Sequence, residues 1–338
     1  MTKDADLSFQ ELIDALLDFD KPFPPRFLYL LSDLEKTDLN KLAAIWDQLP
    51  AWRRQGLMED LAELNERDYL LSYNDLCRFT VKDEDPKVRV SSVKVLEQYD
   101  LKTLIPLYLD LLSTDNDEQV RATAAHALGR YVYLGEIDEI NTSTLQEIED
   151  KLLQTTMGEE EFQIRQVAFE SLGYSSREEV QPLIEEAYNS EKKEWVSSAL
   201  IAMARSANER WRPQVMEKLD SDFPIIKREA ARAAGELEIQ EAIPYLLDLL
   251  DDPDEDILLA STWALSQIGG EGVRERMEQM YDEADTSEYQ DYLELALDNL
   301  EFNEEMRLFP LFDLPENENE DLLDDLQINI AGSTDLPD

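Results

Sequence analysis

Two side chains that often carry out chemistry occur only once each in this 338-residue chain, Cys77 and His126. A lone cysteine can form neither an intramolecular disulfide nor a zinc site built from several thiolates. A lone histidine excludes metal sites that need two, and it confines Ser-His-Asp chemistry to one position. We therefore expect Cys77 to be a small apolar core residue. His126 precedes a small core residue of its helix, and we expect no catalytic or ligand role for it.

Carboxylates are so numerous that no single pair of them identifies an acid/base dyad. The chain has 77 Asp and Glu against 31 Lys and Arg, a net charge of −46. The segments DNDE at 115–118 and DDPDED at 251–256 resemble calcium loops, but they lack the Gly at position six and the Glu at position twelve of an EF-hand. We interpret both as acidic turns between helices. No Gly-rich phosphate loop, GxSxG or HExxH motif is present, so the sequence predicts no catalytic, metal or cofactor site and no enzymatic activity.

The charge balance also limits the kinds of partner. Contacts with nucleic-acid phosphates need clustered Lys and Arg, and an anionic membrane surface repels a chain this acidic. No stretch approaches the roughly 18 apolar residues of a membrane span, and the N-terminus lacks the apolar run of a signal peptide. We expect a cytoplasmic protein whose partner is another protein or a peptide, with a basic partner favoured by charge. The alternative is that the acidity is an adaptation to salt and is unrelated to partners.

Internal repetition is the main structural signal. Residues 242–265 (AIPYLLDLLDDPDEDILLASTWAL) and 104–128 (LIPLYLDLLSTDNDEQVRATAAHAL) share an apolar run opened by Pro, an acidic turn and a second run. The second run follows the pattern apolar, basic, two free, small, two free, small, Leu, Gly, which places the marked residues on one helical face. Its first position recurs at 88, 120, 164, 195, 226, 257 and 289. Each unit is predicted to be two antiparallel helices, with small residues that let the next unit approach closely.

The sequence resembles the HEAT family, and in particular the short HEAT-like repeats named after phycobilisome lyases. The resemblance is carried by Ala-Ile-Pro at 242–244, DDPD at 251–254 and VRATAAHALG at 120–129. It implies an all-α fold, an α-α superhelix of about seven two-helix repeats over residues 81–302. Residues 1–80 are predicted to be an N-terminal helical cap, alternatively containing a degenerate repeat. Residues 303–338 are predicted to be a disordered acidic tail, in which Leu322-Leu323 and Ile328 with Ile330 form apolar pairs for docking.

The resemblance also assigns a structural role to the basic position of the pattern. In three units an acidic residue lies six positions before the Arg, giving Asp83 with Arg89, Asp115 with Arg121, and Glu159 with Arg165. In HEAT-like arrays such residues form a ladder between neighbouring repeats. The alternative is a set of solvent-exposed charges that contribute little each. Arg307, near the tail, is expected to contribute almost nothing to stability.

A row of positions on the second helices is predicted to face a partner. The third and seventh positions of the seven copies hold two acids and three bases, so this row escapes the acidity of the rest of the chain. The residues expected to contact a partner are Lys94, His126, Glu170, Ile201, Arg228, Arg232, Leu259 and Trp263. The alternative is that the apolar ones only fill space between repeats. The family is used mostly as scaffolding, which implies a non-enzymatic adaptor; a phycobilin-lyase-type enzyme or assembly factor is the alternative.

Overall fold

The structure is a computed structural model that describes residues 7–308. All regular elements in that range are helical. The expected tail beyond residue 308 therefore lies outside the described residues. The chain divides into two compact units, one ending at Ala207 and one beginning at Asn208. The helices of the first unit are α1 (Phe9–Leu17), η1 (Pro25–Leu31), α2 (Lys36–Trp46), α3 (Ala51–Arg67), α4 (Asn74–Thr80), α5 (Pro86–Glu97), η2 (Lys102–Leu104), α6 (Ile105–Thr114), α7 (Glu118–Glu136), α8 (Thr142–Met157), α9 (Phe162–Leu172), α10 (Val180–Tyr188) and α11 (Lys193–Arg205). Those of the second unit are η3 (Glu209–Trp211), α12 (Arg212–Lys218), α13 (Pro224–Glu236), η4 (Gln240–Ala242), α14 (Ile243–Leu249), α15 (Glu255–Ile268), α16 (Val273–Glu283) and α17 (Ser287–Leu308).

The acidic turns of the repeats begin helices. Asp85 accepts a hydrogen bond from the main-chain N–H of Lys87, and Asp117 does so from Gln119 and Val120. Asp254 caps α15 in the same way. Side-chain oxygens at this position satisfy N–H groups that have no partner within the helix. The segments that resembled calcium loops thus lie in turns between helices, as interpreted from the sequence, and each contains an N-cap.

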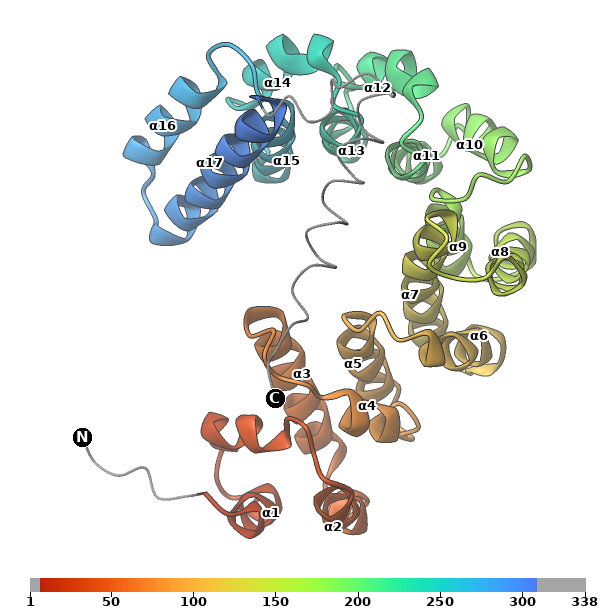
Figure 1. The fold of residues 1–338 in the computed structure, drawn as a ribbon, viewed down its shortest axis with the longest axis vertical. Coiled ribbons are helices and arrows are strands. Elements are labelled where there is room, and N and C mark those ends of the chain that lie inside the picture. Colours follow the sequence, from red (N-terminus) through yellow and green to blue (C-terminus); the bar gives the residue numbers. More distant parts are fainter. Residues whose placement is uncertain (1–6, 309–338) are drawn as a thin grey trace, which may run out of the picture. The chain divides into compact units, whose positions relative to one another are not determined.

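Two layers of helices form within each unit. In the first unit α5, α7, α9 and α11 pack side by side as the second helices of their repeats, while α6, α8 and α10 each pack on the second helix of their own repeat. Figure 1 shows α7 and α9 together, with α6 and α8 outside them. In the second unit α13, α15 and α17 form the equivalent inner layer, with α12, α14 and α16 outside. This architecture is the predicted α-α superhelix.

Small residues set the spacing of the inner layer. A Cβ added at Gly173 would lie 2.7 Å from the Cα of Ala202, and one at Gly235 would lie 2.7 Å from the Cα of Ala264. Only glycine permits this approach, because real Cβ atoms essentially never come so close to backbone. The Gly of the repeat pattern therefore marks a contact between neighbouring second helices.

The repeats extend beyond the boundaries expected from the sequence. Helix α4 packs against α5 as the first helix of its repeat, so the expected boundary between residues 80 and 81 falls inside a repeat. Helix α3 packs against α5 as the other second helices pack on one another. At the other end, α17 continues through the expected boundary at residue 303 to Leu308.

Arg307 makes hydrogen bonds that the sequence did not predict, since it was expected to contribute almost nothing to stability. Its guanidinium donates to the carbonyl oxygens of Gln267, at 2.9 Å, and Ile268, at 2.5 Å, at the end of α15. These carbonyls have no partner within their own helix, so a cation here satisfies them and interacts favourably with the helix dipole. The location of Arg307 near the predicted tail gave no indication of these contacts with α15.

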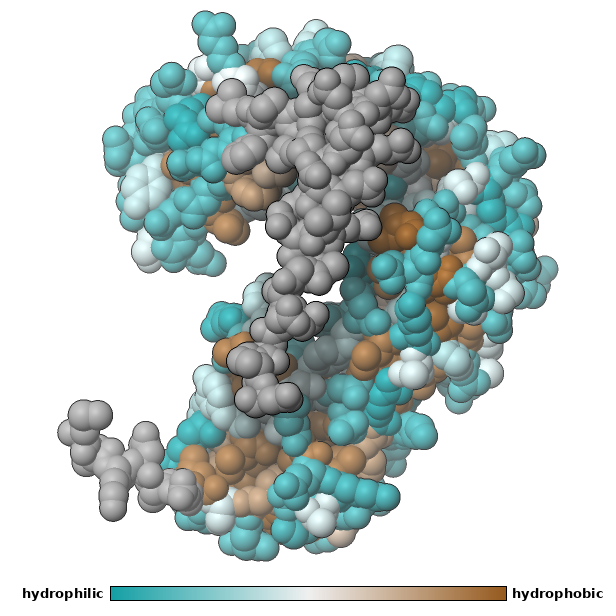
Figure 2. All heavy atoms as spheres, viewed as in Figure 1, coloured by the Kyte–Doolittle hydropathy of each residue, from teal (hydrophilic) through white to brown (hydrophobic). Residues whose placement is uncertain are grey.

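The faces seen in Figure 2 are mainly hydrophilic, with hydrophobic residues visible between helices. This agrees with the acidic composition of the chain. No helix within residues 7–308 is both long and apolar enough to cross a membrane.

Candidate peptide-binding surfaces

The chain's single cysteine is buried, and its single histidine is hydrogen-bonded. Cys77 is fully buried, and burial raises the pKa of its thiol. The His126 ring is about half exposed, and its Nδ1 contacts a carboxylate oxygen of Glu97 on the neighbouring second helix. This hydrogen bond raises the pKa of His126. Among the described residues no group of three or more His, Cys, Asp or Glu side chains could hold a metal ion.

The ladder arginines connect neighbouring repeats. Arg89 donates from Nε and Nη2 to both carboxylate oxygens of Asp115, at 2.8 and 2.7 Å, and Asp115 belongs to the next repeat. Its Nη1 donates to the main-chain oxygen of Asp83, six residues earlier. Arg121 likewise donates to the main-chain oxygen of Asp115. Each of these two arginines therefore contacts the residue six positions earlier through its backbone, while its ion pair reaches forward to the following repeat.

The acid partners consequently differ from the sequence pairing. The side chain of Asp83 is fully buried and pairs with Arg54 of the preceding repeat at 3.0 Å, while the indole N–H of Trp46 donates to the same oxygen. Arg121 pairs with Glu161 at 2.7 Å and with Glu160 at 3.3 Å. Glu159, which the sequence paired with Arg165, is exposed.

Arg165 differs from the other ladder cations. It donates from Nε to the main-chain oxygen of Thr156 at 2.8 Å, and its guanidinium lies 5.8 Å from the ring centre of Trp195. No carboxylate of the described residues pairs with it. The position that holds Asp115 for Arg89 is occupied by Ser190 in the repeat after Arg165. The later cation Lys227 again has its acid, Asp252, at 3.3 Å.

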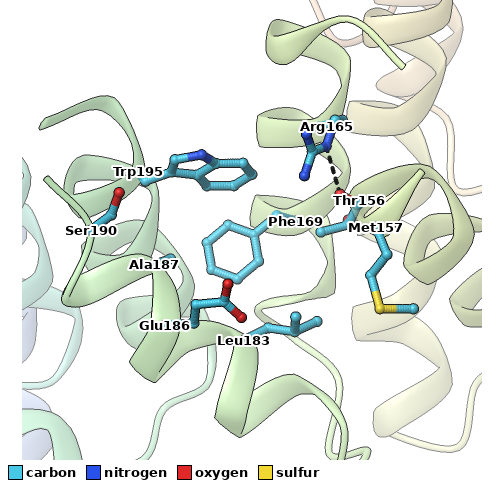
Figure 3. A pocket seen from close by; sticks show the side chains of 9 residues that line it. All are labelled: Thr156, Met157, Arg165, Phe169, Leu183, Glu186, Ala187, Ser190 and Trp195. Carbon is cyan, nitrogen blue, oxygen red and sulfur yellow. Dashed lines mark hydrogen bonds between the residues drawn. The ribbon is translucent and has the colours of Figure 1, made fainter. Parts of the chain in front are cut away.

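A recess of about 360 Å³ opens beside Arg165. The end of α8, the outer part of α9, the helix α10 and the first residues of α11 surround it (Figure 3). Its lining residues are Thr156, Met157, Arg165, Phe169, Leu183, Glu186, Ala187, Ser190 and Trp195. The volume falls within the range of small ligand sites, at its lower end.

The recess combines aromatic walls with opposite charges. Phe169 and Trp195 meet edge to face, with ring centres 5.6 Å apart, and Phe162 contacts Trp195 from another side. In the view of Figure 3, Phe169 lies between Arg165 and the carboxylate of Glu186. Glu186 is exposed, and no basic side chain among the described residues pairs with it. The hydroxyl of Thr156 is buried in the wall without a hydrogen-bond partner.

The expected partner-facing row in the first unit is cross-linked between helices. Gln166 donates to the main chain of Glu194 and to Ser198, and Ser198 donates to Glu170. Together with the contact between His126 and Glu97, these bonds join successive second helices. Lys94 is exposed and Ile201 is half-buried. Much of the polar row here therefore also holds the inner layer together.

The row in the second unit is more open. Arg228 pairs with Asp256 at 3.0 Å and with the buried Glu229, and Arg232, whose side chain is 55% exposed, reaches the same Glu229. Leu259 and Trp263 are half-buried. Neither a ring contact nor a hydrogen bond holds the indole of Trp263 within the part of the chain that the structure describes.

Sequence reasoning did not find the recess. The signal was present, because Ser190 replaces the acid of the ladder just where the preceding repeat supplies a basic residue. Pairing acids with arginines inside one repeat concealed it, since the ion pairs form between neighbouring repeats. Trp195 was placed at an apolar core position, whereas the structure leaves it half-buried against Arg165.

A family model described as HEAT repeats matches residues 74–147 and 212–298, one region in each unit. No curated protein matches the chain. Solved structures with a similar arrangement include YibA of E. coli (16% identity, TM-score 0.41, covering 83% of this chain and 98% of that one). They also include human deoxyhypusine hydroxylase in complex with glycerol (14% identity, TM-score 0.35, 87% and 97% covered). A third is importin beta (11% identity, TM-score 0.41, 86% of this chain and 46% of that one).

Proposed function

Because the chain is a HEAT-repeat protein, we propose that it acts as a cytoplasmic, non-enzymatic scaffold or adaptor that holds a protein partner on the inner face of its second helices. The fold supports this role in general terms, since stacked repeats present extended surfaces suited to binding. Fold alone does not select a function, so the proposal depends on one particular surface.

The surface that carries the proposal is the indole patch of the second unit, which we define as Arg232, Leu259, Trp263 and Leu295. Arg232, Trp263 and Leu295 occupy the same repeat position on α13, α15 and α17, which pack side by side. Leu259 lies one turn before Trp263 on α15. Leu295 is 56% exposed and Trp263 is half-buried. An accessible indole with an arginine beside it is typical of the residues that dominate protein interfaces.

The net charge of the chain suggests the sign of its partner's charge. The chain carries −46 overall, and a basic protein would be attracted to it over long range. The association rate should then fall as salt rises, because screening weakens attraction between exposed charges.

The test is capture of partners from the native host with tagged wild-type protein and with Trp263→Ala. We expect the variant to lose proteins that the wild type retains reproducibly, while its melting temperature changes little. The matched control is Tyr245→Ala, which removes a 51% exposed aromatic side chain from the first helix of the same repeat. Retained capture by Trp263→Ala, combined with a strong loss of stability, would show that Trp263 is a packing residue and would contradict the proposal.

A further inference from the structure

The repeat ladder has one basic residue without an acid. Arg89 faces Asp115, Arg121 faces Glu161, and Lys227 faces Asp252, each from the repeat that follows. In the repeat after Arg165 the equivalent position is Ser190, and Trp195 lies between the two side chains in Figure 3. Where the acid is also replaced by serine at Ser221, the residue at the basic position is Val196, so no cation is left there. Arg165 is thus the exception among the described copies of this motif.

We propose that the recess beside Arg165 binds the carboxylate of a partner's C-terminus, with the last side chain of the partner seated against Phe169 and Trp195. This proposal deepens the role of an interaction scaffold by naming a second surface and the chemistry of the partner that fits it. The ligand carboxylate takes the place that Asp115 has opposite Arg89.

Arg165 is held ready for this contact. Its Nε bond to the Thr156 carbonyl and its position over Trp195 fix the side chain before any ligand arrives. The Nη groups are left to donate, and a planar guanidinium is the residue type best suited to a carboxylate. A preorganised cation binds with a smaller loss of conformational entropy than a mobile one.

The walls select an apolar last residue. Phe169 is buried and forms the floor, and Leu183 and Met157 contribute further apolar surface from α10 and α8. A volume of about 360 Å³ accommodates a large side chain together with its terminal carboxylate. A small or charged last residue would leave these apolar walls in contact with water.

The charges favour a chain terminus over an internal acidic segment. Glu186 lines the recess, and Glu159 and Glu160 lie in the turn before α9, so several acids in one ligand would be repelled. A C-terminus brings a single carboxylate at its tip. A lysine or arginine just before the last residue would then meet Glu186, and the net charge of −46 would attract it.

The probe for the test is a fluorescein-labelled peptide ending in Gly-Lys-Phe with a free carboxylate. Its comparison peptides are the same sequence with a C-terminal amide, and an amidated peptide with an internal Glu. Binding is measured by fluorescence anisotropy. The protein is also labelled with fluorotryptophan, and the Trp195 signal is assigned by its loss in Trp195→Phe. We expect the free acid to bind at least about tenfold more tightly than the amide, as for loss of a charged hydrogen bond, and to shift the Trp195 signal.

Two serine substitutions provide a matched pair. Ser190→Asp supplies the missing acid from within the chain, so it should stabilise the protein and abolish binding of the free-acid peptide. Ser221→Asp makes the same change at the equivalent position that follows Val196, and it should leave binding unchanged. Arg165→Gln should weaken the free acid and leave the weak binding of the amide unaltered.

Several results would overturn the proposal. Equal binding of acid and amide would remove the carboxylate from recognition, and binding that survives Ser190→Asp would place the peptide elsewhere. Equal or tighter binding of the internal-Glu peptide would assign the recess to an acidic side chain and not to a terminus. Absence of binding would reject the recess without affecting the indole patch, whose test uses Trp263→Ala.

Discussion

Gly129 offers the sharpest test of how the repeats are spaced. It lies inside α7, and a Cβ placed there would meet Ser171 of α9, with Oγ at 2.9 Å, Cβ at 3.1 Å and Cα at 3.3 Å. Ser171 cannot turn away without loss, because its buried hydroxyl donates to the main-chain oxygen of Ala125 at 2.9 Å. We predict that Gly129→Ala destabilises the first unit, although alanine favours helix.

The magnitude follows from two opposing terms. Replacing glycine by alanine in a helix interior gains about 1 kcal/mol. Forcing a methyl group into a closely packed contact costs about 1–3 kcal/mol, and displacing the Ser171 hydrogen bond costs about 1 kcal/mol more. Gly56, inside α3 of the same unit, has nothing within 4 Å of its added Cβ. Gly56→Ala therefore keeps the gain without the clash, and the two variants should differ by about 2–4 kcal/mol.

The assay is urea unfolding followed by circular dichroism for the wild type and both variants. Gly56→Ala should shift the midpoint upward, and Gly129→Ala should shift it downward. Adding Ser171→Ala to Gly129→Ala removes the nearest atom, so the pair should show favourable coupling in a double-mutant cycle. Equal stabilisation by the two alanine variants would refute the idea that Gly129 sets the distance between α7 and α9.

Two further predictions concern charged groups. Asp115→Ala should lower the free energy of unfolding by about 3 kcal/mol or more, because it leaves the mostly buried Arg89 without its acid. The control Glu63→Ala breaks an exposed pair with Arg67 and should change the free energy of unfolding by less than about 1 kcal/mol. Equal shifts of the two urea midpoints would contradict the ladder. The bond from Glu97 raises the pKa of His126, so its stabilising contribution should be present below about pH 6.5 and be lost as pH rises through the folded-state pKa. His126→Gln should lack this pH dependence, and a difference between variant and wild type that stays constant with pH would show that the pair does not titrate in this way.

The fold was predictable because the repeat pattern records contacts that recur. The small residues and the glycine appear at fixed spacing since each second helix must approach the next one, as Gly173 and Ala202 show. Helix starts were visible in several repeats, where Pro lies in the first turn, as in α6 and α14, because it needs no hydrogen-bond partner there. Terminal elements were less visible, since α4 is short, has no side-chain N-cap and does not follow the pattern.

The partners of the charged residues were not predictable from spacing within one repeat. Asp83 and Arg89 are six residues apart, yet the carboxylate of Asp83 pairs with Arg54 and the guanidinium of Arg89 pairs with Asp115. Short separation in sequence placed each arginine near a backbone carbonyl, while the carboxylate came from the next repeat in the stack. The prediction for Arg307 was wrong for the same reason: its acceptors lie on another helix.

This forward pairing explains why a serine in one repeat has its effect at an arginine of the preceding one. Each acid in the ladder serves two purposes, since Asp115 pairs with Arg89 and also accepts the main-chain N–H of Asp117 in its own turn. Ser190 retains the second purpose, because its hydroxyl accepts the N–H of Lys192, but it cannot supply a negative charge. The turn therefore folds normally while Arg165 is left without an ion pair. Serine at position 190 preserves the turn and removes only the negative charge. In our proposal, the position that an acid of the next repeat fills beside Arg89 is therefore open to the carboxylate of a ligand beside Arg165.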